Sequence, residues 1–122
     1  MTIKSHRDLL VWQKAMELVE HCYSVTRRFP DSERYGLTSQ IQRAAVSIPA
    51  NIAEGKARGT TKTFLNHLSI AGGSLAELDT HLIIAKRLGY IEEQSLAGLL
   101  DRAEEVGRML TGLRRSLKAK RS

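Results

Sequence analysis

Apolar residues recur at spacings of three and four in four successive segments of the chain, and short polar stretches separate the segments. This period places the apolar side chains of each segment on one face of an α-helix. No alternation typical of a β-strand extends beyond a few residues. The pattern predicts helices at about residues 7–28, 37–58, 62–88 and 94–117, with a frayed basic tail at residues 118–122.

The ends of these segments carry residues that commonly start or stop helices. Ser5 and Asp8 have the spacing of a capping box at the start of the first helix. Gly59 suits the end of the second helix, and Thr60 or Thr61 suits the N-cap of the third. Short connections make sequential helices antiparallel. We therefore predict an all-α protein whose residues 1–122 form one domain, an antiparallel up-down-up-down four-helix bundle.

The composition of the chain indicates the cellular compartment in which the protein is expected. The chain has 122 residues, of which 42% are hydrophobic and 26% charged. Cys22 is the only cysteine, which excludes an internal disulfide and a cysteine-based zinc site. No apolar run approaches the roughly 20 residues that span a bilayer, and the N-terminus lacks the apolar core of a signal peptide. We expect a cytoplasmic protein that does not enter a membrane.

Pro49 lies in the middle of the second predicted helix, where proline costs roughly 3 kcal/mol or more. Gly72 and Gly73 fall at the same height on the third helix, if the two helices meet at the predicted turn. We expect the glycines to allow close approach of a helix kinked at Pro49. Ser47, Asn51 or water would satisfy the carbonyls that proline leaves free. The kink either bends the helix around the core or shapes a binding or assembly surface.

The same register predicts two further contacts between the second and third helices. It places Arg43 level with Glu77, as an ion pair between helices. It also places Glu54 level with Asn66 and His67.

The charge is uneven along the predicted bundle. The chain has 19 Lys and Arg residues against 13 Asp and Glu residues, a formal net charge of +6. An antiparallel bundle gathers most of the excess at one end, where such a surface suits phosphate backbones. The opposing interpretation is that these cations only make the surface soluble. The cations expected at this end are Lys4, Arg7, Lys56, Arg58, Lys62, Arg114, Arg115, Lys118, Lys120 and Arg121.

The sequence offers little for catalysis. The Gly-Gly pair lies within a helix and not after a strand, so no phosphate-binding loop is predicted. Glu17 with His21, and Glu77 with His81, have a spacing that could ligate metal, but the other two helices supply no matching inward carboxylates. We predict no catalytic residues, no metal, no cofactor and no enzymatic activity.

The first helix has an unusually wide apolar face, which includes Val11, Trp12, Leu18 and Tyr23. A monomer rarely exposes a large apolar patch, so this width favours self-association. Alternatively, the first helix is deeply embedded in its own bundle.

Three stretches carry a resemblance to a known family: "DLLVWQKAMELV", "SIPANIAEG" and "IAGGSLAELDTHL", together with the trailing amphipathic helix. The chain resembles the bacterial 23S rRNA-intervening-sequence protein family, also called the four-helix bundle protein family, from about Asp8 to Leu110. The accessory variability determinant of diversity-generating retroelements, which works beside a reverse transcriptase and binds nucleic acid, is similar in fold. The resemblance implies a ring-like homopentamer of four-helix protomers with a basic surface, and it does not imply an enzymatic reaction.

These observations predict a non-enzymatic oligomeric scaffold that binds RNA or DNA through a basic face. The alternative is a protein–protein adaptor without a nucleic-acid role. The residues expected to contact nucleic acid are Lys56, Arg58, Lys62, Arg114, Arg115 and Lys118.

Overall fold

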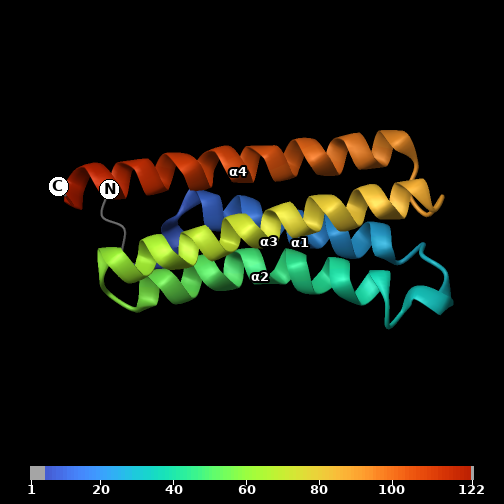
Figure 1. The fold of residues 1–122 in the computed structure, drawn as a ribbon, viewed down its shortest axis with the longest axis horizontal. Coiled ribbons are helices and arrows are strands. Elements are labelled where there is room, and N and C mark those ends of the chain that lie inside the picture. The colour runs from blue at the N-terminus through green and yellow to red at the C-terminus, as the bar shows by residue number, and fades with distance from the viewer. Residues whose placement is uncertain (1–4, 122) are drawn as a thin grey trace.

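The computed structural model describes residues 5–121, and four α-helices lie side by side along the molecule (Figure 1). These helices are α1 (Leu10–Thr26), α2 (Leu37–Ala57), α3 (Thr61–Arg87) and α4 (Glu93–Arg121). Short 3-10 helices, η1 (His6–Asp8) and η2 (Asp31–Glu33), precede α1 and α2. No strand occurs between residues 5 and 121, which confirms the all-helical prediction.

The helices enclose one apolar core. Helix α1 packs beside α2 and α4, and α3 also packs beside α2 and α4, as expected for a four-helix bundle. The largest fully buried side chains come from every helix, because each helix turns an apolar row toward the core. They are Leu18, Cys22, Ile41, Ile48, Ile52, Leu68, Leu78, Leu82 and Val106.

The first α-helix begins later than predicted. Ser5 and Asp8 do form the capping box, with Asp8 Oδ2 3.2 Å from the Ser5 amide, but the box caps the N-terminus of η1 and not that of α1. Leu9 then adopts an extended conformation and is buried in the core, so α1 starts at Leu10. Burial of the Leu9 side chain thus accompanies the break between the two helical segments.

The frayed basic tail predicted at residues 118–122 is wrong as far as Arg121, because α4 continues to that residue. Ala119 and the lysines on either side are good helix formers, and cations are favourable at a helix C-terminus. Ser122 and Lys4 lie outside the described residues.

A polar contact joins the two connections at the end of the bundle opposite the α2–α3 turn. Glu33 Oε1 accepts a hydrogen bond from the Leu37 amide at 3.1 Å and so caps α2, while Glu33 Oε2 accepts one from the Tyr90 hydroxyl at 3.0 Å. The Tyr90 ring also packs against Phe29, with ring centroids 5.4 Å apart. The hydrogen bond to Glu33 and the nearby carboxylate raise the pKa of Tyr90.

Among the described helices, none is both long and apolar enough to cross a membrane.

Candidate functional site

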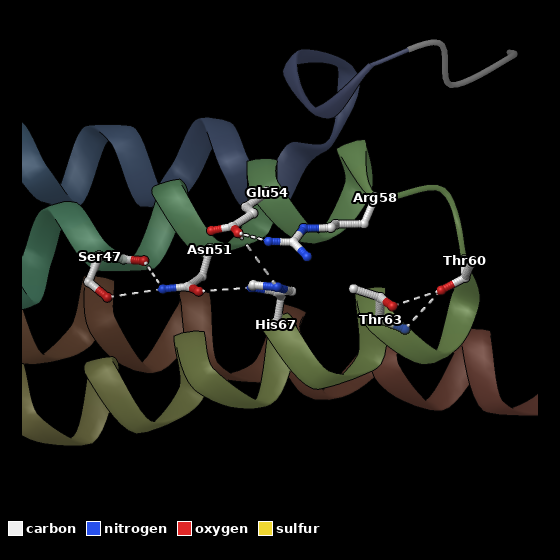
Figure 2. Close-up of polar contacts among 7 residues, drawn as sticks. All are labelled: Ser47, Asn51, Glu54, Arg58, Thr60, Thr63 and His67. Carbon is white, nitrogen blue, oxygen red and sulfur yellow. Dashed lines mark hydrogen bonds and ion pairs between the residues drawn. The ribbon is translucent and has the colours of Figure 1, made fainter.

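A chain of polar contacts runs between α2 and α3 (Figure 2). Asn51 Oδ1 lies 3.0 Å from His67 Nδ1. In addition, the Ser47 and Ser74 hydroxyl oxygens lie 2.7 Å apart. His67 Nε2 then lies 4.0 Å from Glu54 Oε2, so the predicted nearness of these two residues is confirmed. Later positions on α2 therefore meet earlier positions on α3.

Pro49 is buried within α2, which is continuous from Leu37 to Ala57. Asn51 Nδ2 donates to the Ser47 carbonyl at 2.9 Å and to the Ser47 hydroxyl at 3.1 Å. The carbonyl that Pro49 leaves free is that of Ala45, four residues earlier. Asn51 Nδ2 donates to the Ser47 carbonyl instead, so the prediction that Ser47 or Asn51 satisfies the freed carbonyl is not confirmed.

The role predicted for Gly72 and Gly73 is wrong. A Cβ atom on either glycine would meet nothing within 4 Å, because Gly73 is exposed and Gly72 faces open space. The close approach instead occurs at Gly55, which is buried: a Cβ there would lie 2.6 Å from the His67 Cβ. The residue facing Ser47 is Ser74, one position beyond the glycine pair.

The ion pair predicted between Arg43 and Glu77 is not formed. Glu77 Oε1 lies 3.4 Å from His81 Nε2, one turn along the same helix. Arg43 is exposed and has no ion-pair partner among residues 5–121. The register was nearly right, but a histidine on the same helix lies within reach of the carboxylate, as is common at this spacing.

The two parts of the predicted basic surface lie at one end of the bundle. Figure 1 places the α2–α3 turn and the C-terminal end of α4 at the same end. Lys56 and Leu117 line one hollow of about 160 Å³ there, which joins the turn to α4. The hollow that lies on α4 itself, of about 300 Å³, is lined by Thr111, Arg114, Arg115 and Lys118.

The six predicted contact residues differ in availability. Arg115, Lys118 and Lys62 are exposed. Arg58 is exposed but bound to Glu54, with a nitrogen–oxygen distance of 2.6 Å. Lys56 and Arg114 are half-buried, and Arg114 Nε has no hydrogen-bond partner within the described part of the chain. We define Lys62, Arg115 and Lys118, with the half-buried Lys56 and Arg114 and the ion-paired Arg58, as the basic end.

Some apolar residues of α1 are embedded in the bundle, whereas others remain exposed and could serve self-association. Val11 and Leu18 are buried, so they serve the bundle itself. Trp12 is half-buried and packs edge-on against His6, with ring centroids 5.1 Å apart. Tyr23 is 39% exposed and lines a hollow of about 420 Å³ between α1 and α2.

A larger groove lies between α3 and α4, and sequence reasoning missed it. Its volume is about 830 Å³, and Leu75, Ile83 and Leu100 contribute apolar walls. Asp79 also lines it, and Asp79 Oδ1 is buried without a hydrogen-bond partner in the described chain. Burial raises the pKa of the Asp79 carboxyl.

Comparison with known proteins identifies the class of protein. Residues 7–112 match the family described as 23S rRNA-intervening sequence protein, and the chain belongs to that family. No curated protein matches the chain. A crystal structure of a protein of unknown function from the S23 ribosomal protein family of Bacteroides thetaiotaomicron has the same fold, with a TM-score of 0.80 at 22% identity. The similarity covers 87% of this chain and 96% of that one.

Proposed function

We propose that this chain is a non-enzymatic accessory scaffold that binds RNA or DNA through its basic end, as a homo-oligomer in the bacterial cytoplasm. A pentamer of antiparallel up-down-up-down bundles is the assembly that the family resemblance favours. The fold likeness to the accessory variability determinant of diversity-generating retroelements forms part of the same proposal. The gathering of the α2–α3 turn and the end of α4 at one end of the bundle is the observation that carries it.

Contacts along neighbouring helices support the antiparallel arrangement. Ser47 meets Ser74, whereas Asn51 further along α2 meets His67 earlier on α3. Between α1 and α4, Lys14 lies 3.9 Å from Glu105, and Glu17 lies 3.9 Å from Arg102. In both pairs of helices, sequence numbers rise on one helix as they fall on the other.

Electrostatics support a polyanion as the ligand. At the basic end, Glu54 is a nearby acid and is already paired with Arg58. At the other end, acids nearly balance the cations: Glu92, Glu93, Asp31 and Glu33 accompany Lys86, Arg87, Arg27, Arg28 and Arg34. Phosphates therefore meet a more positive field at the first end, and repetition in a symmetric oligomer would enlarge it. The buried Cys22 thiol suits a reducing compartment.

A salt-dependent gel-shift series tests the proposal. The variant R115E/K118E changes two exposed side chains and leaves the half-buried Arg114 in place. Each lost phosphate contact lowers the slope of log affinity against log salt by about 0.9 on duplex DNA and about 0.7 on single strands. We therefore expect weaker binding at low salt and a smaller salt slope for the variant.

The matched control is K86E/R87E, which makes the same charge change on exposed residues at the other end. We expect the control to retain most of the affinity of the parent chain. Equal losses in both variants, or no binding by the parent at low salt, would contradict a localised nucleic-acid site.

The apolar α3–α4 groove favours a second candidate function, a protein–protein adaptor without nucleic-acid binding. Ile83 is 38% exposed in this groove, and exposed apolar surface commonly marks contact with another protein. Co-purification of one protein partner with the nucleic acid removed, together with no gel shift, would favour the adaptor.

A further inference from the structure

The α3–α4 groove contains a carboxylate oxygen that the isolated chain leaves without a hydrogen bond. Asp79 Oδ1 is buried and accepts no hydrogen bond within residues 5–121. Leu75, Ile83 and Leu100 lie around it in the same groove. A buried acceptor without a donor is unfavourable, and such groups in native proteins usually have a partner. A ligand for this groove therefore needs apolar surface around a strong hydrogen-bond donor.

One of the cations that line the groove is already engaged. Arg108 lines the groove, but its guanidinium donates to Glu104 Oε1 at 2.9 Å. Arg115 lies further along α4, at the basic end. The donor that Asp79 lacks is therefore not supplied by these groove residues.

The hollow between α1 and α2 presents the complementary chemistry. We call this surface the α1–α2 face, lined by Tyr23, Arg43, Val46 and neighbouring polar residues. Tyr23 and Val46 are 39% and 42% exposed, and Arg43 on the same surface has no ion-pair partner in the described chain. Arg and Tyr are enriched at the centres of protein interfaces.

The two surfaces lie on opposite sides of the bundle, since α1 with α2 and α3 with α4 form opposite pairs. They also lie at the same height. Ser47 meets Ser74, so Arg43, four residues before Ser47, is level with Leu78, four residues after Ser74. Asp79 is the next residue, about 1.5 Å further along the helix axis.

We propose that the α1–α2 face of one copy of this chain docks into the α3–α4 groove of a second copy, with Arg43 of one copy donating to Asp79 of the other. Two bundles placed side by side in the same direction bring equal heights together, so the register favours a second copy over an unrelated occupant. The contact is heterologous, because each copy uses a different surface, and it repeats from copy to copy. This inference rests on the proposed self-association and assigns its interface.

Light-scattering mass measurement across a concentration series tests the pairing. R43D and D79R each place like charges opposite one another, and we expect at least about ten-fold weaker association for either variant. The double variant R43D/D79R restores opposite charges and should recover most of the assembly. R43Q and D79N remove the pairing without adding repulsion and should weaken association less, with no recovery when combined.

The control is R87D, an exposed cation in the last turn of α3 outside both surfaces. It should assemble like the parent chain, and circular dichroism should show that every variant is folded. A monomeric parent would overturn both this inference and the proposed oligomer. An assembled parent whose R43D and D79R variants assemble equally well would overturn this interface alone. Failure of R43D/D79R to recover would overturn the Arg43–Asp79 pairing.

Discussion

Gly55 on α2 faces His67 on α3 so closely that a Cβ atom at Gly55 would lie 2.6 Å from the His67 Cβ. The Phe64 ring would also lie 3.2 Å away. Because the first clash involves a Cβ atom, which moves only with its backbone, the two helices would have to separate.

We expect Gly55→Ala to destabilise the protein by about 1–3 kcal/mol, since overpacking outweighs the better helix propensity of alanine. Chemical denaturation followed by circular dichroism measures the change. A variant as stable as the parent chain would show that α2 and α3 do not approach so closely.

Gly72→Ala and Gly73→Ala provide the opposite expectation on the same pair of helices. A Cβ atom at either position meets nothing within 4 Å, and both positions lie within α3. Each substitution should stabilise the protein by about 0.4–1 kcal/mol, because alanine restricts the unfolded chain and favours the helix. Thermal melting checks the sign, and a loss of stability would indicate a contact at these glycines, for example with another copy.

The Asn51 side chain connects the turn around Pro49 in α2 to His67 in α3. Its removal should therefore break hydrogen bonds on both helices and lower the stability of the protein. Asn51→Ala removes the donor to the Ser47 carbonyl and the acceptor for His67. We expect a loss of about 1–3 kcal/mol, because partly buried polar groups lose their partners. Asn66→Ala on the exposed side of α3 is the control, expected to change stability by less than about 0.5 kcal/mol. Similar effects of the two substitutions would contradict a bridging role for Asn51.

The same contacts assign the His67 tautomer. Asn51 Nδ2 donates to Ser47, so Asn51 Oδ1 is the atom that faces His67 Nδ1 at 3.0 Å. A carbonyl oxygen only accepts, and therefore the neutral ring carries its proton on Nδ1. Long-range proton–nitrogen NMR on the neutral side chain should show this tautomer in the parent chain and a shift towards the Nε2–H form in Asn51→Ala. Predominance of the Nε2–H form in the parent would contradict the assignment.

Cys22 predicts a loss of stability in alkali. Burial raises the pKa of its thiol from 9.0 to about 12, so the folded chain holds this proton after the unfolded chain has released it. A raised pKa in the folded state contributes stability below pH 9 that is lost as the pH rises towards 12. The expected loss at pH 10 is about 1.4 kcal/mol. Urea denaturation of the parent and of Cys22→Ala at pH 8 and pH 10 isolates it, and equal pH dependence in both proteins would contradict it.

The apolar period predicted four helices with ends close to those observed, because burial of a continuous stripe is the main requirement for each helix. The short turn at Gly59 also placed Glu54 near His67. The exceptions occur at helix ends. Leu9 reaches the core from an extended conformation, and α4 continues through residues that looked like a tail.

The candidate surfaces were only partly predictable. Sequence identified the cations of the basic end, but not that Arg58 is paired with Glu54 or that Arg114 is half-buried. It gave no reason to single out Asp79, whose side chain is notable only because α4 helps to bury it.

The sequence by itself determined which residues share a helix face and roughly which residues of α2 and α3 share a height. Tertiary structure decided which of those residues meet. Successive residues are about 100° apart around a helix, so moving one position changes the neighbour completely. The rotation of each helix depends on how all four pack together, and that packing made Gly55 the close contact while leaving Gly72 and Gly73 open.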